Sequence, residues 1–225
     1  MRICRILLLA LTFVFTASVG ASDNGWEEVD NYGGITIYRK EVPGTPVLAY
    51  KGVGVLDAPI GKLLSVSVDS LRKPEWMPRL DAIKLVKQVS PVERIEYIHL
   101  KSPWPLKDRD LVYRAIMETD VAARKITLKI ASIDEPSCPE TDKCVRAHLY
   151  SGTFVFTPVE NGTKTRMEAE GHTDPRGSIP KWIVNLYQKR IPRQSIEGLM
   201  KQVKKPGIVD HPAAAAILAA PQSAS

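Results

Sequence analysis

The sequence predicts an α+β fold in which antiparallel strands are followed by one long helix. Short apolar or alternating runs fill the middle of the chain, and turn residues separate them. The run over 163–172 alternates most cleanly and follows an Asn161-Gly162 pair, which is typical of a tight hairpin. A helical pattern comes only afterwards, over 178–205. Strands joined by short turns pair antiparallel, so we expect one antiparallel sheet covered by a C-terminal helix.

Eight segments have the composition of strands, because β-branched and aromatic residues recur in them between Gly, Pro, Ser or Asn residues. One helix fits between the second and the third segment, over 59–73. The eight predicted strands are 35–40, 47–56, 83–89, 94–100, 110–118, 125–132, 145–159 and 163–172.

The last predicted strand is expected to contact water on one side only. Its odd-numbered positions from Thr163 to Gly171 are small or apolar, whereas the even-numbered positions from Lys164 to His172 are charged or polar. Successive side chains of a strand point to opposite faces. The odd-numbered positions therefore belong to the face that covers the interior.

The C-terminal helix is predicted from Ser178 to about Lys205. Ser178 is a candidate N-cap, and Pro180 is tolerated in a first turn. The apolar stripe of the first half (Ile179, Ile183, Leu186) is rotated from that of the second half (Ile196, Leu199, Met200, Val203). Pro192 lies where the stripes change phase, so we expect a kink there.

The two ends of the chain are set apart from this domain. Residues 1–21 combine two arginines, an apolar run and small residues at the end, as a secretory signal peptide does. We therefore expect export, to a bacterial periplasm, with cleavage near Ala21. The alternative is an uncleaved membrane anchor, for which the apolar run is short. Residues 208–225 show no periodic apolar face and predict a low-complexity tail, which leaves 22–207 as the domain.

Two cysteines, Cys138 and Cys144, remain after the signal segment. An even pair in an exported protein indicates a disulfide, and the turn-rich residues around it would let the bridge close one loop tip. The alternatives are a pair of free thiols and half of a metal site, which two cysteines alone do not complete.

No catalytic or metal-binding pattern is visible in the sequence. The four histidines, His99, His148, His172 and His211, lack the spacing of metal ligands, and no nucleophile elbow, phosphate loop or paired-carboxylate motif occurs. Ser178 and Lys181 fit an S-x-x-K pattern, but a helix cap explains the serine more simply. We expect no cofactor and no metal.

Four stretches, in order, resemble the motifs of START (steroidogenic acute regulatory protein-related lipid transfer) domains. They are GITIYRK (34–40), DSLRKPEW (69–76), PWPLKDRDLVYR (103–114) and TDPRGSIPKWIVN (173–185). The resemblance covers about residues 26–205 and is nearest to the phosphatidylcholine-transfer type. It implies a helix-grip fold, in which a curved antiparallel sheet wraps around the last helix and a lipid-sized cavity lies between them. Moving an acyl chain into water costs about 0.8 kcal/mol per CH₂, which an enclosed apolar cavity offsets.

The resemblance also implies which side chains line the cavity. In the strand that begins at the Arg-Asp motif, the family directs Arg109 and every second residue after it inward. The last strand and the C-terminal helix supply the other lining residues. The expected lining is Arg109, Leu111, Tyr113, Ala115, Met117, Met167, Ala169, Ile183 and Leu186.

This chain departs from the family pattern at Ala115, where many relatives carry a second inward arginine. Arg114 precedes it and lies on the opposite face. Arg72 or Lys73 falls near a cationic headgroup contact of the phosphatidylcholine carrier, with a solvated surface charge as the alternative. For Arg109 the alternative is an ion pair, with Asp108 or Asp110 among the candidate partners.

The last helix carries seven Lys or Arg residues between 179 and 205 against the single acid Glu197. We expect this face to dock transiently on anionic membrane through Lys201, Lys204 and Lys205, with a solvated face as the alternative. The turn Asp174-Pro175-Arg176-Gly177 would then act as the gate of the cavity.

The expected partners are a lipid and a membrane, and we expect a monomer. Nucleic acid is excluded as a partner because the protein is expected to be exported and its basic face lacks interleaved aromatic residues. The expected function is to carry or sense one lipid. The alternatives are a cavity enzyme of the aromatase/cyclase type and a lipid-gated interaction module.

Overall fold

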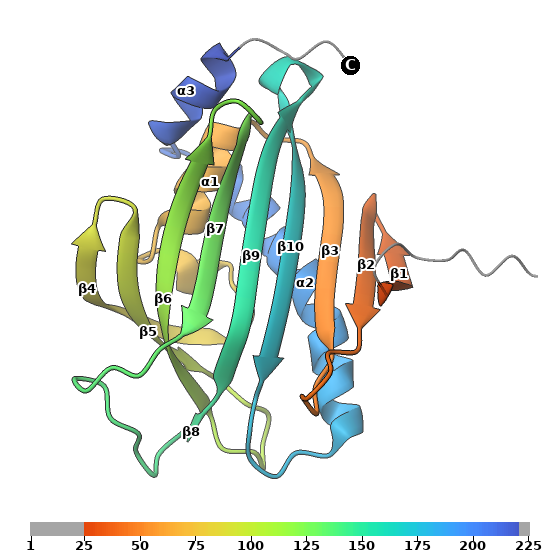
Figure 1. Ribbon diagram of the computed structural model, residues 1–225, viewed down its shortest axis with the longest axis vertical. Helices are drawn as coiled ribbons and strands as arrows, with labels where there is room; N and C mark the ends of the chain where they lie inside the picture. The colour runs from red at the N-terminus through yellow and green to blue at the C-terminus, as the bar shows by residue number, and fades with distance from the viewer. Residues whose placement is uncertain (1–24, 221–225) are drawn as a thin grey trace, which may run out of the picture.

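The computed structural model describes residues 25–220, apart from the side chains of 181, 182 and 185–189. The predicted signal segment and its cleavage point therefore lie outside the described residues. The described chain forms a ten-stranded, curved sheet with helices on its concave side (Figure 1). The predicted α+β, helix-grip fold class is confirmed.

The sheet is antiparallel apart from one short parallel pair. Its order is β1-β2-β3-β10-β9-β7-β6-β5-β4, and β8 pairs with β6 in parallel. The bounds are β1 Glu27–Tyr32, β2 Ile35–Lys40, β3 Ala49–Leu56, β4 Leu80–Ser90, β5 Glu93–Leu100, β6 Arg109–Asp120, β7 Lys125–Ser132, β8 Val145–Arg146, β9 His148–Val159 and β10 Lys164–Asp174. The sequence did not predict β1, which is mostly polar, and it merged β8 with β9.

β3 and β10 pair in the middle of the sheet, although they lie far apart in the sequence. Met167 lies opposite Gly54, and Ala169 lies opposite Gly52. Thr165 Oγ1 donates to Ala58 O at 2.8 Å, a contact that spans 107 positions. The N-terminal three strands are thereby fixed to the C-terminal half of the chain. The predicted hairpin is also present, because the short helix η3 (Glu160–Gly162) joins β9 to β10.

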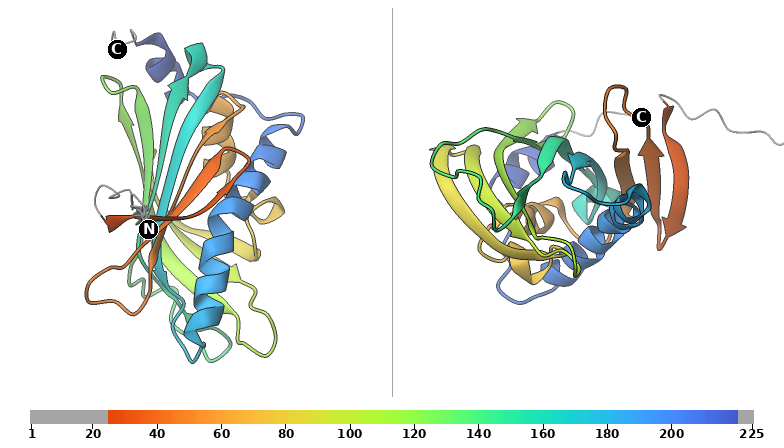
Figure 2. Two further views of the ribbon diagram at one scale, coloured as in Figure 1. Left: turned by 90° about the vertical axis from the view of Figure 1, so that its right-hand side faces the viewer. Right: turned by 90° about the horizontal axis from the view of Figure 1, so that it is seen from below.

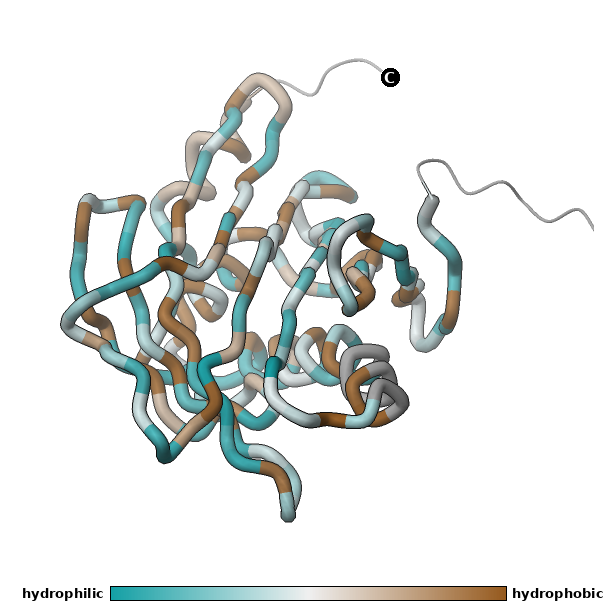
Figure 3. The backbone as a smooth tube through the Cα atoms, turned by 60° about the horizontal axis from the view of Figure 1, so that its bottom comes forward, coloured by the Kyte–Doolittle hydropathy of each residue, from teal (hydrophilic) through white to brown (hydrophobic). Residues whose placement is uncertain are grey.

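Along the strands, polar and apolar positions alternate, so one face of the sheet packs inward and the other contacts solvent (Figure 3). The main core lies between the inward face and three helices. Phe156, Ile126 and Ile37 of the sheet pack with Leu63 of α1 and Leu199 of α2. The helical elements are α1 Ile60–Val68, η2 Lys73–Glu75, α2 Lys181–Val203 and α3 Ala213–Ala219.

α2 lies across the open side of the curved sheet (Figure 2). Its second half buries Ile196, Leu199 and Val203, as the apolar stripe predicts, and Pro192 lies inside it. The predicted cap is wrong: α2 begins at Lys181, and its N-cap is Pro180, without a side-chain cap. Gly177 and Ser178 form a bend instead, and Pro180 has a ψ of 132°, so the helix starts only after it. Proline also disfavours helical backbone in the residue before it, here Ile179.

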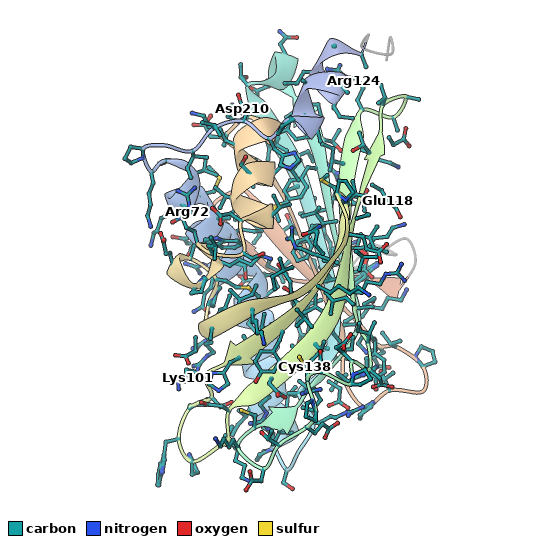
Figure 4. The ribbon with its side chains drawn as sticks, turned by 90° about the vertical axis from the view of Figure 1, so that its left-hand side faces the viewer. Arg72, Lys101, Glu118, Arg124, Cys138 and Asp210 are labelled. Atoms are coloured by element: carbon teal, nitrogen blue, oxygen red, sulfur yellow. The ribbon has the colours of Figure 1, made fainter. Side chains whose placement is uncertain are left out.

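The expectation that residues 208–225 have no face to bury is wrong for their described part. Ala214 and Ile217, three positions apart in α3, are 1% and 0% exposed and belong to the main core. Asp210 lies over Gly61, where an added Cβ would come within 2.6 Å of its Oδ1 (Figure 4). Because Gly61 has no side chain, the segment around Asp210 can pack against α1, although the composition of 208–225 shows no pattern that predicts this packing.

The predicted disulfide is also absent from the structure, in which Cys138 and Cys144 are free thiols. Hydrogen bonds organise their loop instead: the Cys138 amide donates to Glu135 O at 2.9 Å, and Arg146 Nη2 donates to Cys138 O at 3.1 Å. Arg146 also pairs with buried Asp110 at 2.9 Å, which ties the loop to β6.

Candidate functional site

A cavity of about 450 Å³ lies between the concave face of the sheet and α2. Its wall is largely apolar, and its lining includes eight of the nine residues that the sequence predicts for it. Those eight are Arg109, Leu111, Tyr113, Ala115 and Met117 of β6, Met167 and Ala169 of β10, and Ile183 of α2. The side chain of the ninth, Leu186, lies outside the described residues. That these residues bind a ligand stays a prediction.

β6 places alternate side chains in the cavity because its hairpin with β5 fixes the register. Tyr113 lies opposite Glu96, Leu111 opposite Ile98, and Ala115 opposite Arg94. Opposed residues of an antiparallel pair project to the same side of the sheet. Arg94 and Ile98 of β5 therefore line the cavity beside Ala115 and Leu111 of β6, and Glu96 lies beside Tyr113.

This register brings the carboxylate of Glu96, which is 0% exposed, to one end of the cavity. Its Oε2 accepts from Tyr113 Oη at 2.5 Å and from Lys73 Nζ at 3.3 Å. Its Oε1 accepts from Ser70 Oγ and lies 2.8 Å from Arg94 Nε. We call these five residues the polar cluster.

The sequence missed Glu96, Arg94 and Ser70 as site residues. The signal was present in RIEYIHL, where Arg94 and Glu96 share the parity of Ile98 and Leu100. Two charges in line with apolar residues on one face of a strand indicate a buried ion pair, since isolated charges are almost never buried. The β5–β6 hairpin register would then have placed Glu96 beside Tyr113.

The polar cluster changes the acidity of its members. Burial alone would raise the pKa of Glu96, but the charges of Lys73 and Arg94 and the hydrogen bonds from Ser70 and Tyr113 hold that pKa below its ordinary value. Burial lowers the pKa of Lys73, against the attraction of Glu96. Burial, followed by the negative charge of Glu96, raises the pKa of Tyr113 well above its ordinary value.

The structure distinguishes the two candidate headgroup contacts that the sequence left open. Arg72 is partly exposed and forms an ion pair with Asp69 at 2.7 Å, away from the cavity lining. Lys73 is 9% exposed and lines the cavity. The short helix η2 directs Lys73 inward, so Lys73 is the candidate cation at this site.

Arg109 lies at the opposite end of the cavity and forms hydrogen bonds with the predicted gate turn, residues 174–177. Its guanidinium donates to Pro175 O at 3.2 Å, to Arg176 O at 3.0 Å and to Lys107 O at 2.5 Å. The alternative of an ion pair with a neighbouring aspartate is wrong, because no ion pair is formed by Arg109 within the described chain and its nitrogens bind carbonyl oxygens. The turn after β10 is thereby attached to β6.

The gate turn itself has backbone geometry that restricts which residues fit there. Asp174 Oδ1 accepts from the Arg176 amide at 2.8 Å, and Gly177 has a φ of +74°, a region that favours glycine. Movement of this turn stays a prediction.

The three lysines predicted to dock on membrane lie at the C-terminal end of α2, beside η2. Lys201 and Lys204 are exposed. Lys205 Nζ forms an ion pair with Glu75 of η2 at 2.7 Å, in a half-exposed setting. Next to η2, Leu71 is 91% exposed. The Lys205–Glu75 ion pair thus joins the end of α2 that carries Lys201 and Lys204 to η2, which Leu71 precedes in the chain.

Among residues 25–220, no group of three His, Cys, Asp or Glu side chains is placed to hold a metal ion. Nor does any helix of the described chain have the length and apolar character needed to cross a membrane.

A curved antiparallel sheet closed by a long C-terminal helix over an apolar cavity defines the class of helix-grip proteins. Within that class, the chain belongs to the START domain family, whose model matches residues 6–206.

Two relatives illustrate the similarity in sequence. An uncharacterized protein of Pseudomonas aeruginosa is 26% identical, over 90% of this chain and 98% of that protein. The phosphatidylcholine transfer protein of Rattus norvegicus is 31% identical, over 73% of this chain and 77% of its own length.

Two solved structures illustrate the similarity in fold. Human StAR-related lipid transfer protein 5 superposes with a TM-score of 0.75 at 19% identity, over 82% of this chain and 88% of that one. A STAR-related lipid transfer protein fragment from Xanthomonas axonopodis gives 0.72 at 25% identity, over 81% of this chain and all of the fragment. START homologues bind and transfer lipids, so lipid binding is the general activity of the family.

Proposed function

We propose that this protein binds one lipid molecule in the cavity between the sheet and α2, and carries or senses it. The observation that carries this proposal is the largely apolar cavity of about 450 Å³, a volume within the usual range of ligand pockets. Its wall is built from side chains such as Leu111, Met117 and Met167. Apolar surface of this kind offsets the cost of removing acyl chains from a membrane.

Native mass spectrometry of the delipidated protein, after incubation with mixed-lipid vesicles, tests this proposal. We expect the protein to acquire the mass of a single intact lipid. A chemically altered product would instead support the alternative of a cavity enzyme of the aromatase/cyclase type. A protein that stays empty with every vesicle would contradict lipid binding. A lipid-gated interaction module would bind lipid but fail to move it between donor and acceptor vesicles.

We further propose that the C-terminal end of α2 brings the protein to the surface of anionic membranes. Lys201 and Lys204 supply exposed charge, and Leu71, which precedes η2, offers apolar surface. Each Lys or Arg near an anionic surface contributes about 1 kcal/mol of attraction. Transient attachment there would shorten the path of a lipid between bilayer and cavity.

The triple variant Lys201→Glu/Lys204→Glu/Lys205→Glu should bind anionic vesicles at least tenfold more weakly than the wild type, measured by co-sedimentation. Binding by the wild type should require anionic lipid and weaken as salt rises. A matched control reverses three other exposed lysines, Lys84, Lys87 and Lys143, and should lose much less. Equal losses in both triple variants would mean that net charge, rather than the end of α2, controls binding.

We also propose that residues 1–21 direct export to a bacterial periplasm and are removed near Ala21. The charged start, apolar run and small residues of this segment support the proposal. N-terminal sequencing of protein recovered from the periplasm should begin close to Ser22. Recovery of the intact chain from the cytosol would contradict it.

A further inference from the structure

The polar cluster has one more positive charge than negative charge. Lys73 and Arg94 both form ion pairs with the single carboxylate of Glu96, at 3.3 and 2.8 Å. All three side chains are largely removed from solvent, with exposed fractions of 11%, 21% and 0%. The lowered pKa of Glu96 keeps its carboxylate ionised at neutral pH. With Lys73 and Arg94 both protonated, the formal charge of the cluster is therefore +1.

The charged groups around the cluster do not cancel this charge, because they pair with one another. Asp69 forms its ion pair with Arg72 at 2.7 Å, and Glu93 forms its ion pair with Arg114 at 2.7 Å. His211 also lines the cavity, but burial and the nearby positive charge of Arg94 lower its pKa, so it is neutral at neutral pH. The uncompensated charge thus belongs to Lys73 and Arg94.

Arg94 is also incompletely bonded within the described chain. Its Nε lies close to Glu96 Oε1, yet the buried Nε–H has no hydrogen-bond acceptor in suitable geometry. Opposite it on β6 stands Ala115, whose small side chain leaves the guanidinium beside the open space. A buried cation without a full set of partners is costly, and an anion that reached it would remove that cost.

We propose that the lipid taken by this cavity has a net negative charge, and that its acidic group, a phosphate or a carboxylate, lies against Lys73 and Arg94. The inference rests on the proposed lipid-binding function and names the ligand class of the same site. Charge-assisted hydrogen bonds from an ammonium and a guanidinium are the strong contacts for such groups. Bound there, one negative charge neutralises the cluster.

A cationic headgroup does not fit this end of the cavity. Both oxygens of Glu96 are already occupied, by Ser70 and Arg94 on one side and by Tyr113 and Lys73 on the other. No carboxylate oxygen is left to accept a hydrogen bond from an ammonium group. The positive charge of that group would also add to the positive charge of the polar cluster. The site therefore disfavours phosphatidylcholine relative to a lipid of net negative charge.

The opposite end of the cavity does not compete for the acidic group. Arg109 donates its hydrogen bonds to carbonyl oxygens of the gate turn and to Lys107. Lys101 pairs with Asp108 and Asp81, at 3.3 and 3.6 Å. The oxyanion thus lies at the Lys73 end of the cavity. The acyl chains extend along a smaller apolar cluster, separate from the main core. That cluster contains Leu80, Ile98, Leu111, Ala147 and Leu149.

Competitive loading tests the inference. Delipidated wild type is incubated with vesicles that hold equal amounts of dioleoyl phosphatidylglycerol and dioleoyl phosphatidylcholine, and separately with oleic acid, and the bound mass is read by native mass spectrometry. We expect at least tenfold more phosphatidylglycerol than phosphatidylcholine, a difference of about 1.4 kcal/mol. Loading of oleic acid alone, with neither phospholipid, would assign the oxyanion to a carboxylate.

Arg94→Gln should reduce the preference to less than threefold while phosphatidylcholine loading persists, and Arg94→Lys should restore part of it. Arg166→Gln is the matched control, because Arg166 carries the same charge on the outer face of the sheet, away from the lining, and it should keep the wild-type preference. Equal loading of both phospholipids by the wild type would overturn the inference and leave lipid carriage intact. A wild type that loads no lipid would overturn both, and the wild-type comparison decides even if a variant does not fold.

Discussion

Replacing Ala169 with tryptophan will abolish lipid loading while the domain stays folded. Ala169 lies in the middle of β10 and lines the cavity. Tryptophan has the bulkiest side chain, so its ring would occupy space that a lipid needs in a cavity of about 450 Å³. Overpacking a filled core costs about 1–3 kcal/mol, but here the ring enters open space. We expect at least a tenfold loss of bound lipid by native mass spectrometry, with a retained cooperative thermal transition.

The matched control for this change is Glu168→Trp. Glu168 is the neighbouring residue of β10, has the opposite parity and forms a surface ion pair with Arg166. The same ring is then added outside the cavity, so lipid loading should remain close to the wild-type level. Normal loading by Ala169→Trp would contradict the placement of the lipid. Unfolding of Ala169→Trp alone would show that this part of the wall is packed rather than open.

Replacing Glu96 with leucine should lower the free energy of unfolding by about 3–5 kcal/mol, because it leaves Lys73 and Arg94 buried without a counter-charge. Glu96→Gln should cost less, since its amide oxygen still accepts a hydrogen bond from one of the two hydroxyls, Ser70 or Tyr113, and its amino group can donate to the other. Urea unfolding at pH 7 measures both. A loss below 1 kcal/mol in Glu96→Leu would mean that water solvates the two cations or that an anionic ligand neutralises them.

The same carboxylate should contribute to acid sensitivity. Because the folded-state pKa of Glu96 is below its unfolded value, its stabilisation is present above that unfolded value, about 4.3, and is lost as the pH falls through the folded pKa. The stability gap between wild type and Glu96→Gln should therefore be constant from about pH 6 to 8 and narrow below about pH 4. A gap that stays constant down to pH 2 would contradict the lowered pKa.

Alternation and turn chemistry were sufficient to predict the sheet, whereas the inward face of β6 was implied by the resemblance to START domains. Leu111, Tyr113 and Met117 line the cavity because a strand offers only two faces, and the motif before β6 indicates which one is inward. The same rule failed for β1, whose polar residues are held by pairing with β2 rather than by burial.

The polar cluster could not be read from composition, because its members come from three separate segments. Lys73 and Ser70 lie near η2, Glu96 and Arg94 lie on β5, and Tyr113 lies on β6. Only the strand register and the direction of η2 bring them together. Similarly, the burial of Ile217 depends on packing by distant parts of the chain, which a local pattern does not describe.

The pairing of β3 with β10 has a consequence for how the protein is made. At about 5–20 residues per second, ribosomes need roughly 5–20 s to add the hundred or so residues that separate the two strands. During that time the β1–β3 meander has an open edge, with Gly52 and Gly54 on its apolar side awaiting their partners. Unpaired edges recruit other chains. The nascent chain therefore passes through an aggregation-sensitive stage, which ends only when β10 is synthesised.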